Sequence, residues 1–336
     1  MSFKVPNALD NLTGTDVTPK LEIHAKEPES LKLGTKLVGQ SGTQYQIDQM
    51  LQHRTDPILA CVYLAAAKDK RKYVLKNIFH TEFEYQLNMQ APLSDCPNLR
   101  VVIDTIPEKL LFVYNYSTDH LLNLAKKGNL SDATKKRILR DVLVGLADLH
   151  NRISYTVPDN IFVDYDTEPN GAIKVKRDQV GDLEMGSIIP PGLNVRGARL
   201  GNPMWRSPEA HAAARINFPS DIFSFGLVRI IFRIDTEGLS EAEKEKLIVR
   251  RLLSYFADGP GLVGLLEHLD DSVAQWRDLV LATVPEFTTT DPRKPFSMWE
   301  DVDECFRDVM TKMMSLDPAR RITAREALEH PWFQNI

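Results

Sequence analysis

The sequence predicts an α+β fold in which a small sheet-rich lobe precedes a larger helical lobe. Residues 45–51, 60–64 and 72–76 alternate apolar and polar side chains, as half-buried strands do. Residues 131–149 instead carry apolar side chains at three- and four-residue steps, the period of a helix packed on one side. Because most strand-like segments precede residue 117 and most helical segments follow it, we expect two lobes of different architecture.

Composition indicates a soluble globular chain of one bilobal domain. The chain has 336 residues, of which 43% are hydrophobic and 26% charged. Its 41 Lys and Arg against 46 Asp and Glu leave a net charge of -5, so we expect no nucleic-acid or anionic-membrane partner. Three scattered cysteines, Cys61, Cys96 and Cys305, are too few for a disulfide framework and are expected to be reduced.

Nothing in the sequence predicts secretion or a membrane span. The first residues contain no apolar run of the kind that a secretory signal requires. The most apolar stretch, residues 223–234, is short and is interrupted by Arg229 and Arg233. We therefore expect a cytoplasmic or nuclear protein, with no basis for choosing between the two.

The first part of the chain divides into an arm and a lobe. Residues 1–40 mix Pro, Thr, Glu and Lys without a helical or strand period, which predicts a poorly structured arm. Residues 41–116 form the predicted sheet lobe. In addition to its strands, this lobe should contain a helix over residues 81–90 and a hairpin around Pro107.

Residues 117–336 form the predicted helical lobe. Ser131 is suited to cap its first long helix. Two further strands are expected in residues 160–163 and 172–176, followed by an irregular segment that is rich in Gly and Pro. Residues 221–234 are apolar nearly all round, which predicts a helix buried inside the lobe.

Three motifs in the second lobe resemble those of eukaryotic Ser/Thr protein kinases. They are Ser207-Pro-Glu209 after a Gly-rich segment, Ser220-Asp-Ile-Phe-Ser-Phe-Gly226, and Leu316-Asp-Pro-Ala-Arg-Arg-Ile-Thr323 followed by His330-Pro-Trp-Phe333. Each motif alone is modest evidence, but their order and spacing together are specific. The resemblance covers roughly residues 45–333 and implies a bilobal protein-kinase-like fold, with an antiparallel sheet and one helix in the first lobe.

The resemblance assigns structural roles to three charged residues of the second lobe. Glu209 of the first motif should pair with Arg321 of the last, and such a buried pair orients two distant segments. Asp221 should accept backbone hydrogen bonds from the catalytic loop.

The resemblance also implies a site for ATP and Mg²⁺. Lys76 stands where the family has the strand lysine that contacts phosphates, and Glu84 is expected to be its helix partner. Asp182 and Asn160 match the two metal-binding positions, with hard oxygen ligands of the kind Mg²⁺ prefers. However, Asp182 is followed by Leu-Glu rather than the family's Phe-Gly.

The adenine slot implied by the resemblance is formed by apolar residues of both lobes. Val62 and Val74 should form its roof, Phe162 its floor, residues 115–117 (beginning with Asn115 and Tyr116) its hinge, and Tyr114 its back. Apolar residues in strands are most often simply core, so these positions add little independent support.

The phosphate-binding loop departs from the family pattern. Its three glycine positions are Thr55, Pro57 and Ala60. Glycines there allow backbone N–H groups to approach phosphate closely, and proline removes one such donor. Any ATP should therefore be held more weakly than is usual.

The catalytic loop departs further. Counting back from Asn160, the family's His-Arg-Asp falls on Ile153, Ser154 and Tyr155. A tyrosine with an unperturbed pKa of about 10 is no comparable base at neutral pH. If a deletion shifts the register, Asp159 is the alternative base and Asp164 the alternative metal ligand, although the first alignment fits better.

These observations favour a pseudokinase that binds ATP weakly, transfers phosphate poorly or not at all, and acts through protein contacts. One alternative is a divergent active Ser/Thr kinase that transfers the ATP γ-phosphate to protein hydroxyls with Asp159 as base. Another is a scaffold that binds no nucleotide. All three imply a protein partner or substrate, and the sequence leaves the oligomeric state open.

Overall fold

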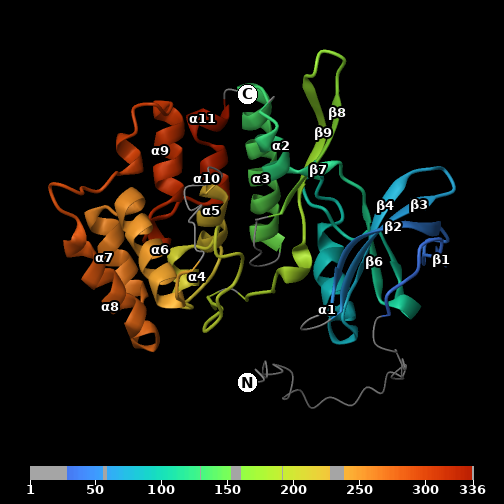
Figure 1. Ribbon diagram of the computed structural model, residues 1–336, viewed down its shortest axis with the longest axis horizontal. Coiled ribbons are helices and arrows are strands. Elements are labelled where there is room, and N and C mark those ends of the chain that lie inside the picture. The colour runs from blue at the N-terminus through green and yellow to red at the C-terminus, as the bar shows by residue number, and fades with distance from the viewer. Residues whose placement is uncertain are drawn as a thin grey trace.

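The computed structural model describes residues 29–55, 59–128, 130–152, 160–190, 192–227 and 238–334. It confirms the two predicted lobes: strands β1–β6 lie together on one side of the molecule, and the helices from α3 onward lie on the other (Figure 1). Among the helices of these residues, none is both long and apolar enough to cross a membrane.

The first lobe is a six-stranded antiparallel sheet with one helix, α1 (His80–Gln90). The strand order is β1-β2-β3-β4-β6-β5. The strands are β1 (Lys36–Val38), β2 (Gln44–Arg54), β3 (Ala60–Ala67), β4 (Lys72–Asn77), β5 (Asp104–Ile106) and β6 (Leu111–Asn115). The predicted alternation holds in β2 and β3, where Tyr45, Ile47, Cys61 and Tyr63 are buried and their neighbours are more exposed, because successive side chains of a strand point to opposite faces.

The boundary predicted at residue 40 lies too far along the chain. Residues 36–38 form β1 and pair with β2, with Leu37 opposite Tyr45. Only Leu37 of this short strand is buried, whereas Val38 is exposed, so no apolar alternation marks the strand in the sequence. The sheet therefore begins inside the segment that was assigned to the arm.

The second lobe is mainly helical and also carries a small three-stranded sheet of order β7-β8-β9. Its strands are β7 (Asp119–His120), β8 (Ile161–Thr167) and β9 (Ile173–Val180). The helices are α2 (Leu121–Lys126), α3 (Asp132–Arg152), α4 (Pro208–His211), α5 (Pro219–Gly226), α6 (Glu241–Phe256), α7 (Gly259–His268), α8 (Ala274–Thr283), α9 (Glu304–Met313), α10 (Ala324–Leu328) and α11 (Pro331–Gln334).

Helix α3 packs in the core of the second lobe and also contacts the first lobe. The Ser131 hydroxyl accepts a hydrogen bond from the Thr134 N–H at 3.1 Å, as the predicted cap requires. The chain comes closest to the helix at Gly145, where an added Cβ would lie 2.8 Å from the Asn98 carbonyl oxygen. Only glycine therefore allows the connection between α1 and β5 to lie against α3.

The predicted buried helix over 221–234 is described only in its first half. Helix α5 ends at Gly226, and residues 228–237 lie outside the described ranges. Ile222, Phe223 and Phe225 are all buried, as the apolar pattern predicts.

Glu209 and Arg321 form the predicted ion pair. Two parallel hydrogen bonds of 2.5 and 2.7 Å join the guanidinium to the carboxylate, and both side chains are almost fully buried. Arg321 also donates to the carbonyls of Ser315, Leu316 and Pro219. The pair therefore connects α4, the start of α5 and the end of the domain.

Replacing Arg321 with Met should lower the free energy of unfolding by roughly 3–5 kcal/mol, because the buried Glu209 carboxylate loses its partner. Urea unfolding measures this. The control is Lys312→Met, which breaks an exposed pair with Asp308 (2.7 Å) on α9 and should cost less than about 1 kcal/mol. Equal effects of the two substitutions would contradict the structural role of the buried pair.

A buried carboxylate lies between β9 and α3. Asp178 is 3% exposed, and its nearest cation, Arg137 Nη2, is 3.8 Å away. Burial, followed by the charge of Asp141, raises the pKa of Asp178 to about 7, against the weaker opposing effect of Arg137. Between about pH 4 and pH 7 the folded chain therefore retains a proton that the unfolded chain has lost.

Stability should consequently fall as the pH rises through this window, and Asp178→Asn should prevent the fall. We expect the variant to exceed the wild type at pH 8 by roughly 1–3 kcal/mol, with a smaller difference at pH 5, in urea unfolding. Asp166→Asn on β8 removes an exposed carboxylate paired with Lys176 and should show no such pH-dependent gain. A pH-independent difference for Asp178→Asn would rule out the proposed titration.

Candidate functional site

Lys76 lies at the junction of the two lobes and pairs with two carboxylates. Strand β4 holds its backbone, with Val62 and Phe112 as its neighbours across the sheet. Its Nζ is 3.3 Å from Asp182 Oδ1 and 3.3 Å from Glu184 Oε2. Burial opposes the charge of the lysine, but Glu184 and then Asp182 outweigh this effect and raise the pKa of Lys76.

The predicted pairing of Lys76 with Glu84 is wrong. The buried side chains of α1 are Phe83, Gln86, Met89 and Gln90, whereas Glu84 is exposed. The helical period turns positions 83, 86 and 90 toward the protein, and Glu84 lies off that face. Gln86, which the sequence reading did not single out, therefore occupies the inward polar position.

Glu184 supplies the second carboxylate instead of the helix. It belongs to a short 3-10 turn, Leu183–Met185, directly after Asp182, and its side chain is only 8% exposed. Its carboxylate also accepts a hydrogen bond from the Tyr114 hydroxyl. The Gln86 side-chain amide donates to the Glu184 carbonyl at 2.9 Å. Three elements of the first lobe, namely β4, β6 and α1, thus contact this one residue.

Tyr114 is a hydrogen-bond donor here rather than only a wall of the slot. Burial, followed by the charge of Glu184, raises the pKa of Tyr114 well above its ordinary value. The phenol therefore stays protonated, and its O–H donates a hydrogen bond to the Glu184 carboxylate.

The backbone brings Asp182 and Asn160 close together. The Gly181 N–H donates to the Asn160 carbonyl at 2.9 Å, so Asn160 lies beside the residue that precedes Asp182. Asp182 itself has a φ of 54°, a left-handed conformation in which Asp is better tolerated than most residues.

The predicted walls of the slot are also brought together. Val62, Val74, Tyr114 and Tyr116 pack in one apolar cluster of the first lobe. Phe162 of β8 is half-buried and belongs to the opposite lobe. Between them lies Arg100, which the sequence reading passed over as a strand residue of the hairpin.

Several predicted residues of the catalytic and phosphate-binding loops cannot be placed. Tyr155 and Asp159 fall within residues 153–159, and Pro57 falls within residues 56–58; both segments lie outside the described ranges. Asp164, the alternative metal ligand, accepts a hydrogen bond from the Thr118 hydroxyl at 2.7 Å.

Asp221 is buried at the start of α5. It is 1% exposed, and its Oδ2 lies 3.0 Å from His150 Nε2 at the end of α3. The catalytic-loop backbone that it is predicted to bind belongs to residues 153–159, outside the described part of the chain.

The family model for the protein kinase domain matches residues 35–333, nearly the whole of this two-lobed structure. The chain belongs to the protein kinase family. The sequence resemblance based on the three motifs of the second lobe is thereby confirmed.

Individual relatives of this kinase-family chain are distant. Serine/threonine-protein kinase 33 from Bos taurus is 22% identical over 245 residues, covering 70% of this chain and 42% of that protein. Myosin light chain kinase A from Dictyostelium discoideum is 24% identical over 292 residues, covering 82% and 83%. Calcium/calmodulin-dependent protein kinase type IV from Mus musculus is 22% identical over 275 residues, covering 80% and 48%. The chain thus spans less than half the length of two of these three relatives.

Protein kinase domains generally bind ATP and Mg²⁺, and this kinase-family chain has residues at the positions that would hold them. Lys76 and Asp182, which would contact phosphate and metal, neutralise each other. No group of three or more His, Cys, Asp or Glu side chains suited to a metal ion occurs among the described residues. Asp182 and Asn160 would supply the carboxylate and the amide oxygen that hold Mg²⁺ in this family.

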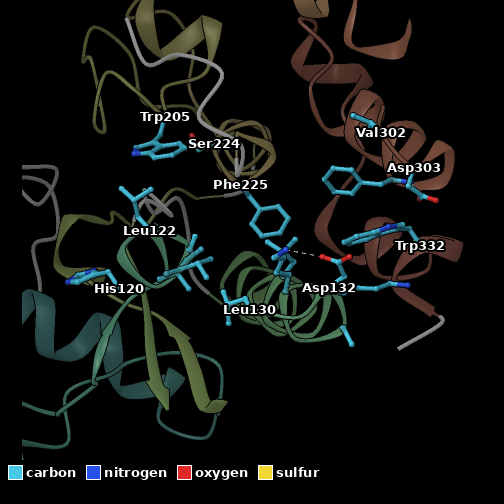
Figure 2. A pocket seen from close by; sticks show the side chains of 18 of the residues that line it. His120, Leu122, Leu130, Asp132, Trp205, Ser224, Phe225, Val302, Asp303 and Trp332 are labelled. Carbon is cyan, nitrogen blue, oxygen red and sulfur yellow. Dashed lines mark hydrogen bonds and ion pairs between the residues drawn. The ribbon is translucent and has the colours of Figure 1, made fainter. Parts of the chain in front are cut away.

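A second hollow of this kinase-family chain lies in the helical lobe. Figure 2 shows Leu122, Trp205, Phe225 and Trp332 around a pocket of about 600 Å³. It is lined mainly by residues of α2, α3, α5 and the last helices, and none of Lys76, Asp182 and Glu184 lines it. It is therefore separate from the nucleotide site of the family.

The pairing of Lys76 with Glu184 can be tested by a double-mutant cycle. We expect Lys76→Met and Glu184→Gln to couple by roughly 0.5–3 kcal/mol in the free energy of unfolding, because they share one interaction. Lys76→Met and Glu84→Gln serve as the matched control and should be additive within about 0.5 kcal/mol. Coupling to Glu84 instead would restore the rejected helix partner.

Proposed function

We propose that this chain is a pseudokinase domain that acts through protein contacts and does not transfer phosphate at a useful rate. The observation that carries the proposal is the arrangement of Lys76, whose ammonium is bound by Asp182 and Glu184 from one short turn. Lys76 and Asp182, the residue at the family's metal-binding position, thereby form an ion pair with each other.

Electrostatics support this proposal. Phosphoryl transfer is catalysed almost entirely by positioning phosphates and neutralising their charge. A phosphate approaching Lys76 must displace two carboxylates, of which Glu184 has no metal-binding role in the family to compensate for its charge. Two like unit charges 4 Å apart repel by about 4 kcal/mol at the effective dielectric of a protein site, so Glu184 opposes an anionic ligand.

The sequence of the catalytic loop supports the same proposal. Tyr155 stands at the position of the proton acceptor. Without the usual acidic side chain at that position, the reaction lacks general-base assistance, which is typically worth about 10²–10⁴ in rate. Together with the engaged lysine, this leaves two separate requirements of the reaction unmet.

A protein is the proposed partner class. The relatives named above are described as protein kinases, and a kinase fold that has lost transfer retains the surfaces by which such domains contact proteins. We propose that a protein partner changes the arrangement of the two lobes, since Glu184 contacts elements of both.

The test is transfer of labelled γ-phosphate from Mg-ATP to generic protein substrates and to the chain itself. We expect the wild type to match Lys76→Met within the background of the assay. Asp159→Ala should leave this background unchanged. Activity in the wild type that disappears in both variants would establish the rival, an active divergent kinase with Asp159 as base.

Variants that restore a single family residue provide a second test. Restoring the family residue at one position alone, by Glu184→Gly or by Tyr155→Asp, should leave transfer at background, because the other requirement remains unmet. Full activity from Tyr155→Asp alone would show that the Lys76 arrangement does not limit the reaction.

A further inference from the structure

Arg100 has a backbone that is held firmly between the two lobes. Its N–H donates to the Val180 carbonyl at 2.8 Å, and the Val180 N–H donates back to the Asn98 carbonyl at 2.9 Å. The Gln179 side-chain amide donates to the carbonyls of Pro97 and Leu99 at 2.8 and 2.9 Å. The Arg100 backbone is therefore bonded to Val180, which precedes Asp182 by two residues in the chain.

The Arg100 side chain enters the slot that the resemblance assigns to adenine. It is only 5% exposed. Its guanidinium carbon lies 4.9 Å from the centre of the Tyr114 ring and 4.3 Å from the centre of the Phe162 ring. The planar cation thus contacts both the back and the floor of the slot, an arrangement in which guanidinium stacks well on aromatic faces.

Arg100 also binds the hinge. Its Nε and Nη2 both donate to the Asn115 carbonyl, at 3.2 and 3.1 Å. Asn115 is the first residue of the predicted hinge, so a backbone acceptor facing the slot is already satisfied. A flat group that stacks on aromatic rings and donates N–H groups to a carbonyl reproduces the chief contacts that a purine amine could make there.

The backbone at Gly181 leaves room for this packing. An added Cβ at Gly181 would lie 2.6 Å from a Phe162 ring carbon and 3.3 Å from Arg100 Cβ. Phe162 and the Arg100 Cβ thus pack directly against the main chain beside Asp182.

We propose that Arg100 is a built-in occupant of the adenine slot, and that the domain excludes purine nucleosides while this side chain is in place. The inference deepens the proposed function, because it concerns the same site and rests on the same absence of transfer, but adenosine binding tests it without any transfer step. It also favours the scaffold that binds no nucleotide over the pseudokinase that binds ATP weakly, two readings that the sequence left open.

The test uses adenosine, which carries no phosphate and so reports only on the slot. Isothermal titration with the full chain should give no saturable binding for the wild type at millimolar adenosine. Arg100→Ala should bind adenosine at least about tenfold more tightly than the wild type, with folding verified by a cooperative thermal transition. Arg177→Ala is the matched control, since Arg177 donates to the next hinge carbonyl, that of Tyr116, at 3.1 Å, and it should behave as the wild type.

A second measurement reads the Arg100 side chain in the wild type itself, and a variant serves only to assign its signal. The Nε–H of Arg100, assigned by its loss in Arg100→Lys, should exchange with solvent more slowly than the Nε–H groups of exposed arginines. Rapid exchange, adenosine binding by the wild type, or a folded Arg100→Ala that binds no adenosine would each overturn the proposal. Adenosine binding without phosphate transfer would overturn only this inference, whereas phosphate transfer from ATP by the wild type would overturn the proposed function as well.

Discussion

The carboxylate of Glu184 is the contact on which the arrangement of the two lobes most depends. It belongs to the second lobe, yet it accepts from Lys76 on β4 and from Tyr114 on β6, while its carbonyl accepts from Gln86 on α1. The three first-lobe elements are thus fixed relative to Asp182. Burying a carboxylate without partners costs free energy, so the contacts between Glu184 and these donors stabilise the arrangement of the lobes.

A second contact between the lobes lies one layer deeper, around residues 97–100. The Gly145 backbone on α3 allows this segment to approach, and Gln179 and Val180 at the end of β9 bind its carbonyl and N–H groups. Arg100 extends from this anchored segment to the hinge. The same short connection therefore joins the lobes and carries the arginine that we propose occupies the adenine slot.

The predictions that the structure confirms rest on local chemistry or on paired motifs. Ser131 caps α3 because its hydroxyl accepts from the backbone N–H three residues later, a contact that the local sequence is sufficient to predict. The Glu209–Arg321 pair follows from two motifs whose joint presence requires the contact. By contrast, Glu84 was misplaced because a helix period leaves several residues near the inward face, and small rotations decide which one enters the site.

The sequence alone determined the family and the order of the two lobes, because these depend on residue types at motif spacings, and it predicts a tyrosine at the position of the usual proton acceptor. Only the tertiary structure decided what surrounds Lys76 and what the Arg100 side chain contacts. Glu184 and Arg100 act on partners 108 and 15 residues away along the chain, and their roles depend on where the backbone points their side chains. Pairing between residues far apart in the chain produces no periodic pattern in the sequence. A charged residue in a loop is most often exposed to solvent, so the sequence alone predicts exposure for both residues.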